Sequence, residues 1–308
     1  MLHAIEQQTV KPSEIIVVIP KGYTLDHTIG YERIIHSAKG MVTQRAVGIA
    51  EANGDYLLVL DDDLDFPPDF AEKMYSHLKV HQLDCVLPFG GSKVVSEEKN
   101  ISKKDPFKKK MIQWAKRLRL AFTGQAFYSH RKSQWFDTIA STGGHRTYVN
   151  CEEGLCQTGA FACFFIKASK AKDVHFEEEL WLEQGSISSY AAYDDAVFYY
   201  KLYLQGGKIA YTHNTDFLHL DAAAGRPAPD RITAKRIRLY TIARNRTIFW
   251  HRHIWASQHN LHTLLGGIYG MVNYAFYSTI INLYPPNWPA IGAMIRGYQD
   301  AYKSIKRT

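Results

Sequence analysis

The chain has 308 residues and a formal net charge of +7, and 46% of its residues are apolar and 22% charged. These fractions are close to those of soluble globular proteins, so a disordered or collagen-like chain is excluded, and the length allows one large domain or two small ones. The positive charge favours anionic partners, and the aromatic content of 13% suits a carbohydrate face or a membrane interface as readily as a core.

Strand and helix signals alternate over the first ninety residues. β-Branched and apolar runs predict strands, and Pro67-Pro68 predicts the start of a helix. The predicted elements are, in order, a strand at 14–19, a helix at 42–52, a strand at 56–60, a helix at 70–81 and a strand at 85–88. This alternation predicts an α/β fold with a Rossmann-like, mostly parallel central sheet flanked by helices.

Three carboxylates, Asp61, Asp62 and Asp63, directly follow the predicted strand at 56–60. Ligands of such sheets bind beyond the carboxyl ends of the strands. Adjacent carboxylates repel one another, so they form either a solvated turn or cap, or a site where carboxylate oxygens and ligand phosphates share a hard cation.

The segment 44–63 resembles the family 2 glycosyltransferases of the GT-A fold: an Arg-bearing helix precedes a strand that ends in Asp-x-Asp. The resemblance implies that Arg45, Asp61, Asp62 and Asp63 bind a nucleotide-diphospho-sugar. It further implies that Asp61 and Asp63 hold Mg²⁺ or Mn²⁺ against the diphosphate.

A second block extends the resemblance. The segments 158–162 and 176–181 resemble parts of the family near the acceptor, and 193–202 resembles its Glu-Asp motif and following helix. Asp194 stands where the family usually has Glu, and Asp195 matches the general base. His219, after a predicted strand at 209–211, matches a frequent metal-ligand His.

The residues themselves leave alternatives open at these positions. Asp194 and Asp195 also suit a helix N-cap, with Ala196 beginning the helix. His219 also suits an ordinary polar or core histidine, and His213 is a competing metal ligand.

The resemblance covers residues 1–225 as a GT-A domain, followed by a C-terminal helical, membrane-proximal extension at 226–308. The first eight residues already resemble the helix that follows the family's first strand, and 18–22 lacks the Asp residues that usually contact the base. The nucleotide-base pocket is therefore expected to be incomplete, through a late recorded start, a trimmed chain or a different handling of the donor.

Inverting transfer needs one carboxylate to take the acceptor proton and a cation to stabilise the departing diphosphate, whereas retention by double displacement needs a second carboxylate. We expect a UDP- or dTDP-linked sugar donor and a saccharide or lipid-linked saccharide acceptor, in the synthesis of a bacterial surface polysaccharide or glycolipid. The segments 244–245 and 293–297 resemble rhamnosyltransferase-like members.

The pattern at 103–119, basic on one face and aromatic on the other, predicts an amphipathic helix that is either solvated or bound to an anionic membrane surface. No nucleic-acid-binding motif accompanies it, so no nucleic acid partner is expected. The segment 261–295 lacks Asp, Glu, Lys and Arg, but two Asn residues and a Pro-rich break divide it. It predicts a hairpin on a membrane surface or on the protein.

The first eight residues do not form a signal peptide, and four cysteines without paired spacing predict reduced, buried thiols. We therefore expect a cytoplasmic protein, peripheral on the inner face of the cell membrane.

Two other functional classes are alternatives to the glycosyltransferase. One is a non-catalytic, membrane-associated assembly subunit with the GT-A fold, and the other is a phosphatase with an Asp-x-Asp nucleophile. The second fits Asp194, Asp195 and His219 less well.

Overall fold

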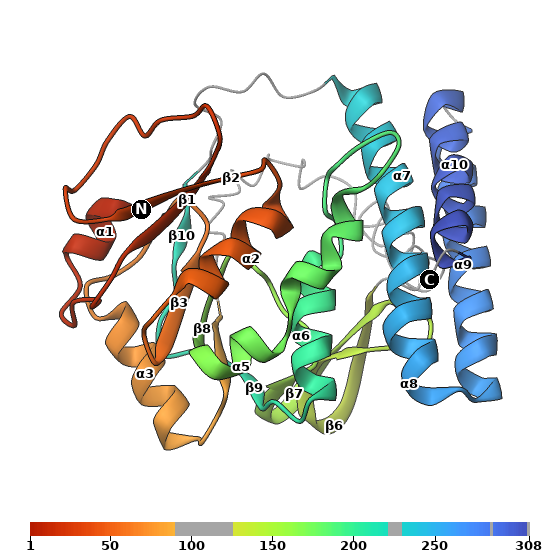
Figure 1. Cartoon of the computed structure of the whole chain (residues 1–308). Helices are drawn as coiled ribbons and strands as arrows, with labels where there is room; N and C mark the ends of the chain where they lie inside the picture. The colour runs from red at the N-terminus through yellow and green to blue at the C-terminus, as the bar shows by residue number, and fades with distance from the viewer. Residues whose placement is uncertain (90–125, 221–229, 284–285, 307–308) are drawn as a thin grey trace, which may run out of the picture. The chain divides into compact units, whose positions relative to one another are not determined.

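The computed structural model describes residues 1–89, 126–220, 230–283 and 286–306 (Figure 1). The chain forms two compact units. The first unit comprises 1–92, 153–184 and 189–227, and the second comprises 93–152, 185–188 and 228–308. The first unit ends close to the predicted boundary at 225, whereas the second also takes up two earlier segments. Their division into a catalytic domain and an extension stays a prediction.

The first unit contains the predicted alternation of strands and helices. Its strands are β1 (Ile16–Pro20), β2 (Arg33–Ser37), β3 (Tyr56–Leu60), β4 (Leu64–Asp65), β5 (Cys85–Pro88), β8 (Cys163–Lys167), β9 (Ile209–Thr212) and β10 (Leu218–His219). Its helices are α1 (Leu2–Glu6), α2 (Met41–Glu51), α3 (Phe70–Val80), α5 (Ala168–Asp173), the 3-10 helix η1 (Phe176–Glu183) and α6 (Asp194–Leu204). The five elements predicted between residues 14 and 88 are confirmed, with bounds shifted by at most a few residues.

The main sheet of this unit is mixed rather than mostly parallel. Its strands lie in the order β3-β8-β5-β9. β8 is antiparallel to both β3 and β5, whereas β5 and β9 are parallel. At the far side of β9, the end of β7 (His145–Cys156) adds an antiparallel pair through Leu155 and Ala210. The α/β class with flanking helices is confirmed, and β8 is what breaks the parallel arrangement.

The two faces of β8 lie in different parts of the core, because successive side chains of a strand point to opposite faces. Cys163 and Phe165 belong to the cluster that covers one face with Phe70 and Met74 of α3. Phe164 stacks on Phe161 on the other face, at 5.0 Å between ring centroids. That second face is closed by an aromatic cluster with residues from η1 and α6: Phe161, Phe164, Phe176, Phe198 and Tyr199.

The second unit is mainly helical. Its elements are β6 (Ala126–Ile139), most of β7, α7 (Arg231–Phe249), the π-helix η2 (Trp250–Trp255), α8 (Ala256–Gln258), α9 (Leu261–Ile281) and α10 (Trp288–Ile305). Helices α7 and α10 pack closely because Gly297 has no side chain: a Cβ there would lie 2.5 Å from the Tyr240 carbonyl oxygen. The C-terminal helices predicted from the sequence are thus present.

Among the described residues, one helix, α9, is long and apolar enough to cross a membrane by length and composition. The sequence predicted a hairpin over 261–295; in the described residues, α9 ends at Ile281 and α10 runs from Trp288 to Ile305. The predicted basic helix at 103–119 lies outside the described residues. None of the four cysteines forms a disulfide; Cys85, Cys156 and Cys163 are buried as predicted, and Cys151 is half-buried.

Candidate functional site

The guanidinium of Arg45 joins the two acidic motifs of the first unit. Its Nη2 donates to Asp61 Oδ1 at 2.5 Å, and its Nη1 donates to Asp194 Oδ2 at 2.6 Å. The Arg45 side chain is only 11% exposed, so both pairs lie in surroundings where charge interactions are stronger than in water. The Asp-x-Asp strand end and the Asp-Asp helix start therefore form one site.

Helix α2, which carries Arg45, is held at its N-terminus by a distant carboxylate. Glu183 accepts hydrogen bonds from the Val42 backbone N–H at 2.6 Å and the Thr43 hydroxyl at 2.8 Å. The carboxylate lies where a side chain on Gly40 would have to be placed. A negative charge here satisfies open backbone donors and interacts favourably with the helix dipole.

Residues of the segment 158–162 contact both Arg45 and Asp61. The Phe161 ring lies 4.4 Å from the Arg45 guanidinium carbon, a cation–π contact that keeps the cation in place. The Asp61 backbone N–H donates to the Ala162 carbonyl at 2.8 Å, and the Tyr199 hydroxyl donates to the Ala160 carbonyl at 3.0 Å. The segment predicted near the acceptor thus fixes both Arg45 and Asp61.

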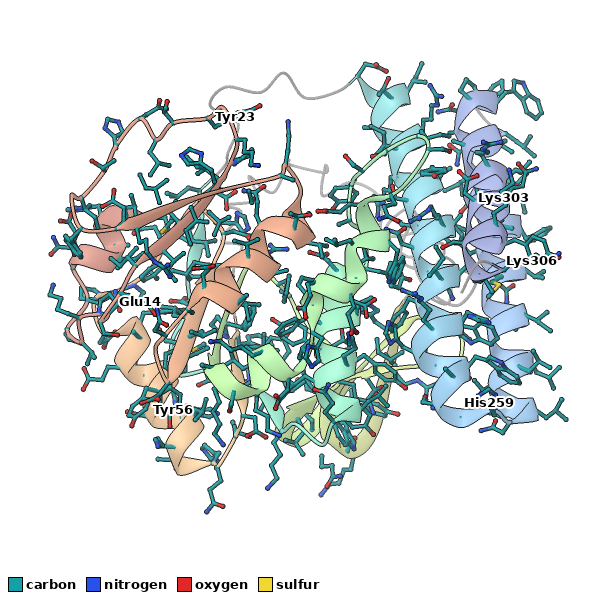
Figure 2. The ribbon with its side chains drawn as sticks, in the orientation of Figure 1. Glu14, Tyr23, Tyr56, His259, Lys303 and Lys306 are labelled. Atoms are coloured by element: carbon teal, nitrogen blue, oxygen red, sulfur yellow. The ribbon has the colours of Figure 1, made fainter. Side chains whose placement is uncertain are left out.

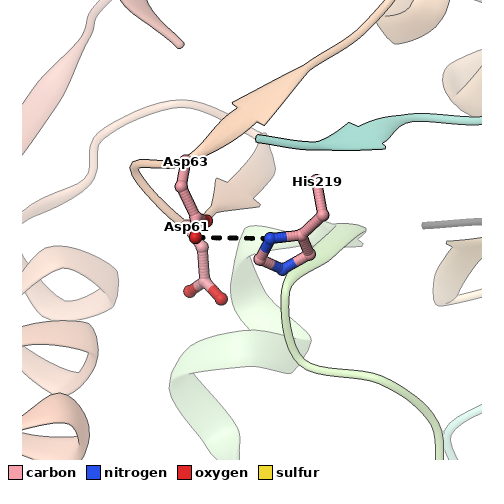
Figure 3. A group of neighbouring side chains, drawn as sticks. All are labelled: Asp61, Asp63 and His219. Carbon is pink, nitrogen blue, oxygen red and sulfur yellow. Dashed lines mark ion pairs between the residues drawn. The ribbon is translucent and has the colours of Figure 1, made fainter. Parts of the chain in front are cut away.

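Asp61, Asp63 and His219 offer ligand atoms that all lie within 4.8 Å of one another (Figure 3). His219 Nδ1 lies 3.3 Å from Asp63 Oδ2. The short antiparallel pair of β4 and β10 sets this distance, because His219 pairs with Leu64 and the Leu220 N–H donates to the Asp63 carbonyl at 2.7 Å.

The donor set of this group fits a divalent cation. Two carboxylates and one imidazole converge from different elements, and all three are at least partly solvent-accessible. Carboxylate oxygens are suitable ligands for both Mg²⁺ and Mn²⁺. Mg²⁺ is bound almost entirely by oxygen ligands, so the imidazole nitrogen fits Mn²⁺ better. Asp61 and Asp63 would hold such an ion together with His219.

The structure does not bring the other sequence candidates into this group. His213, the competing ligand, is exposed and contacts Phe89, with ring centroids 4.2 Å apart and the ring planes tilted by 40°. Asp62, the middle carboxylate, is exposed and outside the group. Of the two histidines, His219 is the one that lies beside Asp61 and Asp63, and its role as a metal ligand stays a prediction.

The acidic pair opens helix α6, which begins at Asp194 itself rather than at Ala196. Tyr193 precedes it in a left-handed conformation, with φ of 78°, which is unusual for a residue other than glycine. The Ala196 backbone N–H donates to Asp195 Oδ1 at 2.7 Å. The predicted alternative of an N-cap at Asp194 and Asp195 is therefore wrong, because Tyr193 is the N-cap and makes no side-chain cap hydrogen bond. Both acids lie in the first turn of α6, where a helix N-terminus stabilises a carboxylate.

The two acids differ in their surroundings. Asp194 is buried and paired with Arg45, whereas Asp195 is half-buried. Burial and the neighbouring Asp195 raise the pKa of Asp194 to about 7, against the opposing effect of Arg45. Burial also raises the pKa of Asp195, while its hydrogen bond to Ala196 and the charge of Arg45 lower it. Burial likewise raises the pKa of Asp61, although Arg45 opposes the shift.

Three supporting residues escaped the sequence analysis as individuals. Phe161 lies within a segment that had been singled out, but nothing in its pattern indicated a contact with Arg45. Tyr199 reads as a core aromatic on α6. Glu183 carries no sequence signal, because its partner helix lies 140 residues away.

The sequence matches the family model described as Glycosyl transferase family 2 over residues 1–174. No curated protein sequence matches the chain. Among solved structures, S. aureus TarS (1–349) is 14% identical with a TM-score of 0.42, the match covering 100% of this chain and 86% of that chain. Mannosyltransferase PcManGT from Pyrobaculum calidifontis, in complex with GDP-Man and Mn²⁺, is 11% identical with a TM-score of 0.42, covering 98% and 81%.

GalNAc-T7, solved with UDP, GalNAc and Mn²⁺, is 12% identical with a TM-score of 0.44. That match covers 89% of this chain and 51% of GalNAc-T7, so the chain spans about half the length of that relative. All three scores are below 0.5, and the assignment therefore depends on the family model, which covers more than half of the chain. The chain belongs to glycosyl transferase family 2, with the α/β GT-A fold that its motifs implied.

Proposed function

We propose that this chain is an inverting, metal-dependent glycosyltransferase that moves a sugar from a nucleotide-diphospho-sugar to a hydroxyl acceptor. One observation carries the proposal: Arg45 pairs with both Asp61 and Asp194, so a cation-binding motif and a candidate base belong to one site. The family membership supplies the reaction class.

The donor side of the site is Asp61, Asp63, His219 and Arg45. A divalent cation held by the first three would neutralise the diphosphate and stabilise its departure. The imidazole in this set favours Mn²⁺ over Mg²⁺. Arg45 holds Asp61 in position and favours its charged form, because the ion pair opposes the burial that raises the pKa of Asp61.

Asp195 is the proposed general base. The terminal nitrogens of Arg45 pair with Asp61 and Asp194 rather than with Asp195, whose Oδ1 accepts a hydrogen bond from the Ala196 backbone N–H. Asp195 takes the proton of the acceptor hydroxyl while the oxygen forms a bond to the anomeric carbon. The bond from that carbon to the diphosphate oxygen breaks, and the nucleoside diphosphate leaves with the electron pair. One displacement of this kind inverts the anomeric configuration.

The substrates follow from the sequence rather than from the geometry. We propose a UDP- or dTDP-linked donor and a saccharide or lipid-linked saccharide acceptor in surface polysaccharide or glycolipid synthesis. A cytoplasmic location, peripheral on an anionic membrane, is part of the same proposal. It agrees with the apolar helix α9.

Titration calorimetry with UDP, dTDP and GDP, each with and without Mn²⁺, tests the proposal. We expect one nucleoside diphosphate to bind in a Mn²⁺-dependent manner, and the corresponding nucleotide sugar to be transferred or slowly hydrolysed. Binding without any turnover by the wild-type chain would favour the competing non-catalytic assembly subunit. Failure of all three nucleotides to bind would contradict both the donor site and the enzyme.

A further inference from the structure

The outward face of α9 is apolar along its whole length. Eight large apolar side chains on this helix are exposed, with Leu261 at 69%, Val272 at 61% and Phe276 at 58%. All but Ile281 recur every three or four residues, which places these seven on one face of the helix: Leu261, Leu265, Ile268, Tyr269, Val272, Phe276 and Ile280. We call this set the α9 outer face.

The inward face of the same helix carries small and polar residues instead. Its buried positions are Thr263, Gly267, Gly270, Tyr274 and Ser278. Gly267 packs directly on the Trp250 ring, and a Cβ on Gly270 would lie 2.6 Å from Arg246 Nη2. A helix of a water-soluble domain has the opposite arrangement, with its apolar residues inward. Small and polar residues inward and large apolar residues outward are typical of a helix that contacts lipid.

The composition of the sequence around the α9 outer face favours contact with lipid over contact with a second protein chain. The sequence 261–295 contains no Asp, Glu, Lys or Arg, whereas protein interfaces are surrounded by a polar rim. An amphipathic Trp opens the next helix, where Trp288 is 64% exposed. Cationic side chains follow in the last turns of α10, at Lys303 and Lys306 (Figure 2). Anionic head groups attract such charges.

The packing of α9 favours a helix that lies in the membrane plane over one that crosses it. Near the C-terminus of α9, Lys235 Nζ of α7 donates to Asn282 Oδ1 at 3.2 Å, and towards its N-terminus Gly267 packs on Trp250 just after α7. The two helices therefore run side by side. Helix α7 carries many Lys and Arg residues, and these cannot enter the hydrocarbon core without a large cost. The outer face alone can be immersed.

We propose that the α9 outer face inserts into one leaflet of a lipid bilayer and attaches the chain to the membrane with α9 parallel to its surface. This attachment gives the peripheral membrane location of the proposed function a defined contact surface, and it does not depend on the transfer reaction. The interaction is mainly apolar, so it persists at an ionic strength that screens exposed charges.

Flotation of the full chain with zwitterionic phosphatidylcholine vesicles tests this surface. We expect the chain to bind the vesicles at both 0.1 M and 1 M salt, with an affinity that depends only weakly on the salt concentration. The double variant Val272→Asp/Phe276→Asp should bind at least about 10-fold more weakly, because two carboxylates would have to enter the apolar layer. The control Val10→Asp/Val80→Asp changes two exposed valines of the first unit and should bind like the wild type.

Three outcomes would overturn the proposal. The wild-type chain could fail to bind vesicles, or the α9 double variant could bind them like the wild type. Alternatively, the wild type could form a dimer that does not bind vesicles, while the double variant is a monomer. The last would assign the face to a second copy. The depth of residue 272 in the bilayer is measured by the quenching of Trp fluorescence in a Val272→Trp variant with brominated lipids. Quenching strongest at the bilayer centre would contradict the in-plane position. Nucleoside diphosphate binding by the same variants reports the donor site separately.

Discussion

Arg45 and Asp194 form a 2.6 Å ion pair across 149 residues of sequence. The same guanidinium holds Asp61 through its other terminal nitrogen. Because the guanidinium of Arg45 pairs with both carboxylates, a substitution at Arg45 alters both halves of the site. Each carboxylate can in turn be tested by itself.

Replacing Arg45 with Met should abolish donor binding and lower the free energy of unfolding by about 2 kcal/mol. This is less than the roughly 3–5 kcal/mol for a fully buried pair, because Asp61 is partly solvated. Arg33→Met is the matched control. Its pair with Glu51 has both side chains about half-exposed, and such pairs contribute about 0–1 kcal/mol. Equal losses of stability in urea titrations would contradict the special role of Arg45.

Replacing Asp63 with Ala should remove Mn²⁺-dependent donor binding and lower the free energy of unfolding by at most about 1 kcal/mol, since its pair with His219 is partly solvent-exposed. His219→Ala should weaken the same binding, because the two side chains belong to one ligand group. Asp65→Asn, two residues along the chain and exposed, is the control and should bind normally. A Mn²⁺-dependent calorimetric signal that survives in Asp63→Ala would refute the cation site.

Replacing Asp195 with Asn should lower turnover by about 10²–10⁴-fold with donor affinity unchanged, because the variant keeps the shape of the side chain but cannot accept a proton. Asp194→Asn should affect turnover less and donor affinity more, through its ion pair with Arg45. The measurement is kcat beside the donor Kd for both variants. A larger fall in kcat for Asp194→Asn would reverse the assignment of the base.

The raised pKa of Asp194 predicts a pH dependence of stability. Its pKa is about 7 in the folded chain against 3.8 for an ordinary Asp, so the folded state binds the proton more tightly. The free energy of unfolding should therefore fall as pH rises from about 4 to about 7, and this contribution should be constant outside that window. Urea titrations at pH 5 and pH 8 should show a smaller change for Asp194→Asn than for the wild type. Identical changes would contradict the raised pKa.

Two glycines of α10 should respond in opposite directions to the same change. Gly297→Ala places a methyl group against the Tyr240 carbonyl, and such overpacking costs about 1–3 kcal/mol. At Gly292 nothing lies within 4 Å of the added Cβ, so Gly292→Ala should stabilise the helix by up to about 1 kcal/mol. Thermal unfolding of both variants checks the close packing of α7 and α10. A stable Gly297→Ala variant would argue against it.

The local pattern of the sequence determined the elements on which the site is built. Tyr56–Leu60 is a strand because five apolar residues follow a Gly-Asp turn and end at the carboxylates. Phe70–Val80 is a helix because its apolar residues recur at helical spacing after Pro67-Pro68. These signals are contained within a few residues, and so are the Asp-x-Asp and Asp-Asp motifs that carry the family resemblance.

Only the tertiary structure decided what pairs with what. The antiparallel position of β8, the placement of His219 rather than His213 beside Asp63 and the bridge of Arg45 between Asp61 and Asp194 all join distant segments. Periodicity reports which face of an element is apolar but not its neighbour, because strand order and side-chain pairing depend on the packing of the whole unit. The same holds for α9, whose apolar composition is visible in the sequence. That its glycines face inward and its large side chains outward follows only from its packing in the second unit.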